Sequence, residues 1–112
     1  MLSVFNKSDE MYLTISERLV MKCLWDADHE MVLHEILEDC LNRFGKEWKS
    51  QTVSTYLRHL VEKGFLRMKR SGKYCTYEIL ISKEEYFRLD VRSFAEYWNL
   101  EESFVTSLTD GK

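Results

Sequence analysis

Apolar side chains recur three or four residues apart in two segments near the N-terminus, a spacing that places them on one face of a helix. We predict the first helix over about residues 15–26, because Thr14 and Glu17 at its start have the spacing of a capping box. A second helix is predicted over residues 33–44, and Gly45 provides its expected C-terminal stop. The polar residues between the two segments predict a loop.

A third helix and a β-hairpin are predicted next. The helix is expected to begin after Ser50, as its N-cap, and to end at Gly64. Beyond Gly64 the apolar period changes to two, so residues 65–69 and 74–79 are predicted as strands. Residues 70–73 between them are predicted as a turn, which gives the hairpin a basic tip.

A fourth helix is predicted to begin at Ser82, because Ser82 and Glu85 again have the spacing of a capping box. Its apolar stripe is rich in aromatic residues that one small domain could hardly bury alone, so we expect it to form a dimer interface. Packing of this stripe onto the first helix is the alternative. The expected interface residues are Phe87, Val91, Phe94, Trp98 and, after an interruption at Glu101, Val105.

The order helix, helix, helix, hairpin, helix is that of a winged helix-turn-helix domain with an added C-terminal helix. The predicted fold class is therefore mainly α with a small β-hairpin. The length of 112 residues suits a single domain. We expect a flexible N-terminal tail over residues 1–12, the winged helix over 13–81, and a C-terminal helical dimerisation segment over 82–112.

The formal net charge of −3 argues, as a whole-chain average, against a nucleic-acid partner. The charge is unevenly distributed, however. Residues 43–77 contain nine cations and two anions, a net charge of +7, so the rest of the chain carries −10. This positive segment coincides with the third helix and the hairpin, the two elements that would contact DNA. An ordinary solvated basic face is the alternative.

The predicted outer face of the third helix carries short polar side chains and one arginine rather than the usual lysines and glutamates. Gln51 can pair with adenine, and Arg58 can pair with guanine or a phosphate. The basic hairpin tip is expected to lie on the phosphate backbone, whereas Tyr74 and Tyr77 are expected to pack within the hairpin. The candidate DNA-binding residues are Lys49, Ser50, Gln51, Thr52, Ser54, Thr55, Arg58, His59, Lys69, Arg70 and Lys73.

Other kinds of function find little support in the sequence. It contains no motif of nucleophilic, phosphate-binding or zinc-protease chemistry, so we expect neither an enzyme nor a cofactor. His29, His34 and Cys40 have poor ligand spacing, so no metal site is expected. Three cysteines without a C-x-x-C pair favour a cytoplasmic setting. Cys23 and Cys40 are predicted as buried apolar residues, with redox sensing as the alternative.

These residues resemble the penicillinase and methicillin-resistance repressor family of bacterial winged-helix regulators, over about residues 13–98. At the N-terminal end the resemblance rests on Thr14, Glu17, Val20, Met21 and Trp25. In the third helix and hairpin it rests on Trp48, Thr52, Val53, Thr55, Leu57, Leu60, Lys63, Gly64, Gly72, Lys73 and Tyr74. The sequence departs from the family pattern at His59, usually arginine, and at Lys49, usually a capping serine or alanine.

The resemblance implies a homodimeric transcriptional repressor that binds an operator dyad through its third helix and wing. It also implies that the dimerisation segment is shorter than in relatives of the antibiotic-resistance type. Some relatives respond to a regulatory protease or to copper, but neither signal is carried over to this sequence. A winged-helix module that binds a partner protein instead of an operator is the alternative function.

Overall fold

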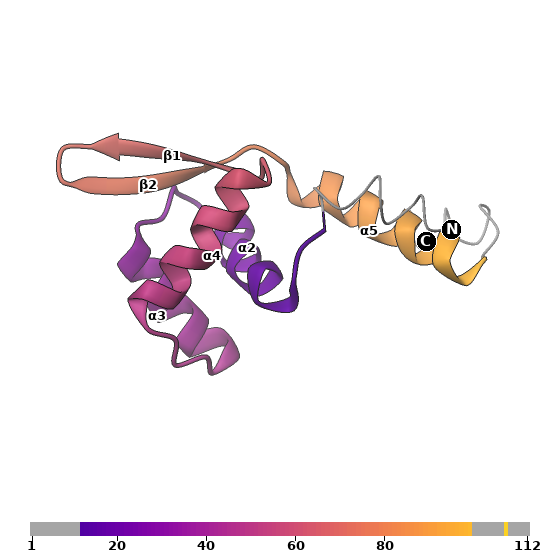
Figure 1. Cartoon of the computed structure of the whole chain (residues 1–112), viewed down its shortest axis with the longest axis horizontal. Coiled ribbons are helices and arrows are strands. Elements are labelled where there is room, and N and C mark those ends of the chain that lie inside the picture. Colours follow the sequence, from indigo (N-terminus) through magenta and orange to yellow (C-terminus); the bar gives the residue numbers. More distant parts are fainter. Residues whose placement is uncertain (1–11, 100–106, 108–112) are drawn as a thin grey trace. The chain divides into compact units, whose positions relative to one another are not determined.

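The computed structural model describes residues 12–99 and residue 107, and it confirms a mainly helical fold with a two-stranded hairpin (Figure 1). The chain divides into two compact units, which we describe separately. Residues 13–81 form the first unit, and α5 belongs to the second. The elements, in chain order, are α2 (Ile15–Asp26), α3 (Leu33–Phe44), α4 (Ser50–Glu62), β1 (Leu66–Ser71), β2 (Tyr74–Ile79) and α5 (Lys83–Trp98).

The start of α2 confirms the predicted capping box. The Thr14 hydroxyl accepts a hydrogen bond from the Glu17 amide at 3.1 Å, and the Glu17 carboxylate accepts one from the Thr14 amide at 3.1 Å. Both amides lack partners inside the helix, so this exchange stabilises its first turn. At the far end of α2, the Trp25 indole N–H donates a hydrogen bond to the Ile81 carbonyl at 2.9 Å.

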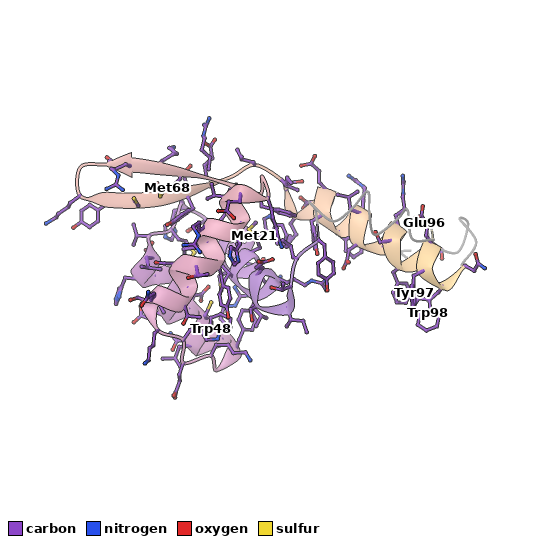
Figure 2. The ribbon with its side chains drawn as sticks, viewed as in Figure 1. Met21, Trp48, Met68, Glu96, Tyr97 and Trp98 are labelled. Atoms are coloured by element: carbon purple, nitrogen blue, oxygen red, sulfur yellow. The ribbon has the colours of Figure 1, made fainter. Side chains whose placement is uncertain are left out.

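The core of the first unit lies where α2, α3 and α4 pack together, with β1 against α4. Each helix contributes the apolar side chains spaced three or four residues apart that predicted it. Met21 from α2 lies inside this cluster (Figure 2). Leu41 and Val61 also belong to the predicted stripes, but they lie at the edge and are exposed. The fully buried side chains include Leu13, Val20, Met21, Cys23, Leu24, Ile36, Cys40, Val53, Leu57, Leu60, Phe65 and Leu66.

The ends of α3 and α4 follow the predicted glycine stops. Gly45 after α3 and Gly64 after α4 both have positive φ angles, +67° and +84°, which glycine adopts without strain. The start of α4 differs from the prediction. Lys49 is the N-cap and Ser50 the first helical residue, because the Lys49 carbonyl already accepts the amide of Val53 at 3.2 Å. No side chain caps this exposed helix start.

The hairpin is longer than predicted. β1 extends through Ser71, which pairs with Tyr74, and Arg70 pairs with Cys75. The turn therefore contains only Gly72 and Lys73, so the prediction of a four-residue turn over 70–73 was wrong. Gly72 has a φ of +62°, which suits the first position of a two-residue hairpin turn. The two additional residue pairs continue the antiparallel ladder up to the turn, because the backbone twist of a two-residue turn matches that of the strands.

In the second unit, α5 begins with the predicted capping box. The Ser82 hydroxyl accepts the Glu85 amide at 3.0 Å, and the Glu85 carboxylate accepts the Ser82 amide at 2.9 Å. The helix ends at Trp98, and the next residue, the C-cap Asn99, has a positive φ. Val105 of the predicted stripe lies outside the described residues.

Candidate nucleic-acid interface

The two faces of α4 differ sharply in chemistry. Val53, Leu57 and Leu60 are fully buried in the core of the first unit. The opposite face carries polar side chains close to the helix start. Among the candidate residues, Lys49, Ser50, Gln51, Ser54 and Arg58 are exposed, whereas Thr52, Thr55 and His59 are half-buried.

Thr55 and Arg58 on this face differ in how freely they can bind a ligand. The Thr55 hydroxyl donates to the Gln51 carbonyl at 3.0 Å, so its proton is used within the helix. Its oxygen can still accept a hydrogen bond, and its methyl group can contact an apolar surface. Arg58 lies 4.0 Å from Glu62, and both side chains are 65% exposed. An exposed pair at this distance adds little stability, so the guanidinium can leave it at small cost.

His59 on α4 and Lys63 directly after it both approach the buried Glu17 carboxylate, although the His59 side chain remains 42% exposed. The Lys63 ammonium donates to the buried Glu17 carboxylate at 2.6 Å, and His59 Nδ1 lies 3.4 Å from the same carboxylate. This cluster joins the end of α4 to the start of α2. The structure therefore directs His59, a predicted DNA-binding residue, toward Glu17.

Glu17 is ionised in this cluster. Burial opposes its ionisation, but the hydrogen bonds from Lys63 and from the Thr14 amide, with the electrostatic effects of Lys63 and His59, outweigh that opposition. The net result is that the pKa of the Glu17 carboxyl is lowered. The carboxylate thus fixes the end of α4 on the rest of the fold. The capping-box pattern predicted its bond to Thr14, but no local pattern predicted its bond to a residue 46 positions away.

The cations of the wing, the hairpin β1–β2, fall into two groups. Arg67 donates to Glu78 across the strands at 2.9 Å. Lys69 lies 3.1 Å from the Glu30 carboxylate, which comes from the loop between α2 and α3. By contrast, Arg70 and Lys73 form no ion pair with a carboxylate within the described part of the chain. The Lys73 ammonium instead lies 5.7 Å from the centre of the Tyr74 ring.

Glu30 is a residue that the sequence did not single out. Besides Lys69, its carboxylate accepts the Thr76 hydroxyl at 3.3 Å, so one side chain contacts both strands of the wing. The wing is thereby attached to the loop that precedes α3. An isolated glutamate in a polar loop carries no local signal for such a role.

Ion pairs within the fold reduce the positive charge that the wing and α4 can offer. Of the nine cations in residues 43–77, those paired with carboxylates at less than 4 Å are Arg43, Lys63, Arg67 and Lys69. Within the described residues, those free of such a pair are Lys46, Lys49, Arg58, Arg70 and Lys73. Lys46 and Lys49 precede α4 and Arg58 lies on it, whereas Arg70 and Lys73 lie on the wing. The available charge is therefore concentrated on the two elements that carry the candidate residues.

An aromatic contact supports the start of α4. Trp48, in the segment before the helix, packs edge-to-face on Tyr56, with the ring centres 5.1 Å apart. Both residues are half-buried. Figure 2 shows Trp48 beside the helix. The contact fixes the chain that leads into the polar face of α4.

The second unit has an exposed aromatic surface on α5. Phe94 is 56% exposed and Trp98 is 59% exposed. Tyr97, which the predicted stripe does not include, packs edge-to-face on Trp98 with ring centres 5.1 Å apart (Figure 2). Phe87 is also exposed, and Val91 is half-buried.

Within residues 12–99 and 107, no helix is long and apolar enough to cross a membrane. The same residues contain no group of three or more histidine, cysteine or acidic side chains placed to hold a metal ion.

A family model described as penicillinase repressor matches residues 13–110, which include both units of the structure. Comparisons with curated proteins and with solved structures gave no significant match. The matched range contains α4, the wing and α5, and the observed order of elements is that of a winged helix. The chain therefore belongs to the penicillinase repressor family.

Proposed function

We propose that this chain, a member of a family of DNA-binding transcriptional repressors, acts as a homodimer on a dyad operator. The observation that carries the proposal is the polar outer face of α4, where Gln51, Ser54 and Arg58 are exposed opposite a fully buried apolar face. A helix of this kind fits the major groove, where its first turns reach the base edges. Short polar side chains there allow close approach of the helix backbone.

The proposed roles follow from position on the helix and wing. Gln51 and Thr52, in the first turn of α4, are placed for base edges, and Thr55 can accept a hydrogen bond or contact a thymine methyl. Arg58, farther along, reaches either a guanine or a phosphate. On the wing, Arg70 and Lys73 bind phosphates, which adds affinity without reading sequence.

The second proposed element is dimerisation through α5. Exposed aromatic side chains are enriched in protein interfaces because they bury much apolar area at low entropic cost. Phe87, Phe94 and Trp98 supply such an area on one helix, and Val91 lies on the same stripe. A homodimer would place two copies of α4 on half-sites about one helical turn apart, or a multiple of it.

The test is a fluorescence-anisotropy titration of the full chain with labelled duplex DNA from upstream of its own gene, at several salt concentrations. We expect the logarithm of affinity to fall linearly with the logarithm of salt concentration, with a slope of about −0.9 for each phosphate neutralised. Binding that is absent, or unaffected by salt, would overturn the proposal. An unrelated duplex of equal length is the control for sequence specificity.

The same samples test the alternative, a module that binds a partner protein. Sedimentation velocity with and without DNA measures the assembly directly. A chain that stays monomeric at all concentrations and ignores duplex DNA would contradict both elements of the proposal and favour the protein-binding function. A dimer that shifts to a larger complex with DNA supports the repressor.

A further inference from the structure

Two cysteine side chains meet in the core between α2 and α3. The Sγ atoms of Cys23 and Cys40 lie 3.7 Å apart, and both residues are fully buried. The third cysteine, Cys75, lies on β2 and is half-buried. A disulfide bond is about 2.05 Å long, so the two core sulfurs need to approach by only about 1.6 Å.

The surroundings make the two thiols unequal. The hydrogen bond to Cys40 raises the pKa of Cys23, and burial and the negative charges of Cys40 and Asp39 raise it further. For Cys40 the bond from Cys23 lowers the pKa; burial and Asp39 oppose this effect, and the nearby Arg43 guanidinium supports it. Cys40 is therefore the sulfur that ionises more readily, and Cys23 keeps its proton. A thiol with a lowered pKa that is hydrogen-bonded to a second thiol is the arrangement of a redox-sensitive pair.

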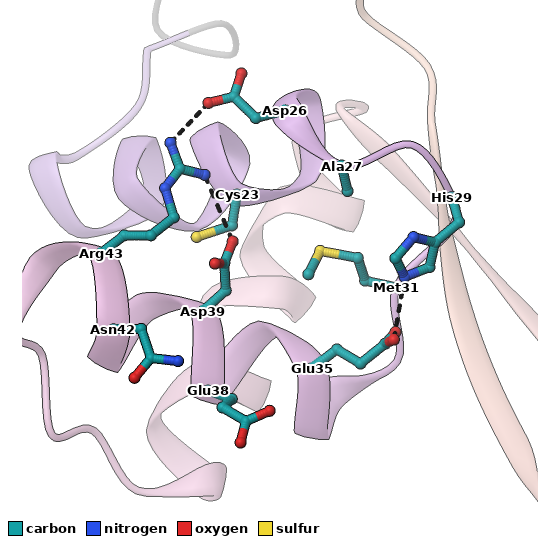
Figure 3. Close-up of a pocket in the computed structure, with 10 residues that line it drawn as sticks. All are labelled: Cys23, Asp26, Ala27, His29, Met31, Glu35, Glu38, Asp39, Asn42 and Arg43. Carbon is teal, nitrogen blue, oxygen red and sulfur yellow. Dashed lines mark hydrogen bonds and ion pairs between the residues drawn. The ribbon is translucent and has the colours of Figure 1, made fainter.

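A pocket on the surface of the first unit borders one member of this pair, Cys23. It has a volume of about 390 Å³, and Cys23 forms part of its wall together with residues of α2 and α3. Figure 3 shows the Cys23 sulfur beside the Asp39 carboxylate, with Arg43 joined to Asp26 and Asp39. Most residues of the lining are polar, so the pocket suits a small polar oxidant. An oxidant in the pocket lies against Cys23, and the Cys40 sulfur, which is not part of the wall, is 3.7 Å from the Cys23 sulfur.

We propose that Cys23 and Cys40 are a site of reversible oxidation, at which a hydroperoxide converts the two thiols into a disulfide that joins α2 to α3. The Cys40 thiolate attacks one peroxide oxygen, so an S–O bond forms, the O–O bond breaks, and the departing oxygen takes up a proton. Cys23 then attacks the Cys40 sulfenic sulfur, forming the S–S bond as the S–O bond breaks. The oxygen leaves as water, with the Cys23 proton.

The electrons balance, because the two sulfurs lose two electrons and the hydroperoxide gains them. With hydrogen peroxide the products are one disulfide and two water molecules. An external thiol reverses the reaction by thiol–disulfide exchange. The inference uses only the packing of α2 against α3, so it does not depend on the proposed DNA binding.

The test uses the full chain, treated with hydrogen peroxide, unfolded, alkylated and digested with trypsin. No lysine or arginine lies between Cys23 and Arg43, so both core cysteines leave in one peptide, residues 23–43. We expect this peptide to lose two hydrogen atoms and both alkylation sites, and to regain them after treatment with dithiothreitol. The folded protein should form this disulfide faster than the chain unfolded in urea.

The control variant is Cys75→Ser, which removes the third thiol and should leave the disulfide unchanged. Cys40→Ala should abolish it; if that variant fails to fold, the peptide from the unmodified chain still decides. The proposal is overturned if both core cysteines remain alkylatable after peroxide treatment. It is also overturned if Cys40 is oxidised to a sulfinic acid without bonding to Cys23, or if folding does not accelerate the reaction.

Discussion

The Glu17 carboxylate at the start of α2 and the Lys63 ammonium at the end of α4 lie 2.6 Å apart, although 46 positions separate them in the sequence. Glu17 is 2% exposed and also accepts the Thr14 amide, so one side chain caps α2 and holds α4. Removal of either charge would take from the other its closest ion-pair partner in a partly buried site. The position of the proposed recognition helix therefore depends on this pair.

Glu17→Gln should destabilise the fold by about 1–3 kcal/mol, because the amide keeps the shape and the bond to Thr14 but removes the negative charge that the Lys63 ammonium contacts. Urea unfolding measures the change. Glu62→Gln is the matched control, since Glu62 is 65% exposed and lies 4.0 Å from its partner. We expect the control to change stability by less than about 0.5 kcal/mol. Equal effects of the two substitutions would contradict the role assigned to Glu17.

The same pair predicts a pH dependence. The pKa of Glu17 is lowered in the folded state, so its contribution to stability is present above the unfolded value of about 4.5. That contribution is lost as the pH falls through the folded pKa. The melting temperature of the unmodified chain should therefore fall more steeply below pH 4.5 than that of the Glu17→Gln variant. Parallel curves for the two proteins would contradict the lowered pKa.

Arg58→Ala and Lys73→Ala should both weaken binding to operator DNA. Loss of a phosphate contact at Lys73 should make the salt slope less negative by about 1 and affect all sequences alike. If Arg58 reads a base, its loss should cost about 1–3 kcal/mol and relax the preference at one position. Anisotropy titrations against single-base variants of the operator measure both effects. Lys22→Ala on α2 is the control, and it should leave affinity unchanged.

Glu30→Gln should increase DNA affinity and make the salt slope more negative, because Lys69 would lose its carboxylate partner and could neutralise a phosphate. The amide can still accept the Thr76 hydroxyl, so the wing remains attached to its loop. Glu38→Gln on α3 removes the same charge from an exposed position and serves as the control. Equal gains for both variants would mean that net charge alone, and not the release of Lys69, controls affinity.

Trp98→Ala should weaken the proposed dimer. Removal of an aromatic residue that anchors an interface costs about 2 kcal/mol or more, which is roughly a thirtyfold loss of dimer affinity. Sedimentation equilibrium over a range of concentrations measures this. Tyr74→Ala on the wing is the matched control, because Tyr74 has the same 59% exposure as Trp98. A loss of dimer in the control variant would place the interface elsewhere.

Local chemistry explains why most element boundaries were predictable from the sequence. The capping boxes at Thr14 and Ser82 and the glycine stops at Gly45 and Gly64 act within a few residues of themselves. The start of α4 was misplaced by one residue, because Ser50 is a typical N-cap residue whereas the observed N-cap, Lys49, makes no side-chain capping bond. The strands continue up to a two-residue turn at Gly72 and Lys73. The run of polar residues over 70–73 made the turn look longer than it is, because strand residues at a hairpin tip can also be polar.

Contacts between residues that are distant in the sequence could not be predicted from local sequence patterns. Glu30 meets Lys69 across 39 positions, and Cys23 meets Cys40 across 17. Such pairs depend on how α2, α3 and the hairpin pack, which helical periodicity does not encode. The charge of +7 over residues 43–77 identified the basic region, but not which cations the fold itself neutralises.

Internal pairing of Lys69 and Arg67 affects how a repressor would find its site among bulk genomic DNA. Every free cation on the wing strengthens binding to any sequence, and the genome offers a vast excess of competing sites. With Glu30 and Glu78 neutralising these two residues, a larger share of the binding free energy must come from the side chains of α4. Weaker binding to DNA of any sequence would then raise the ratio of operator affinity to non-specific affinity.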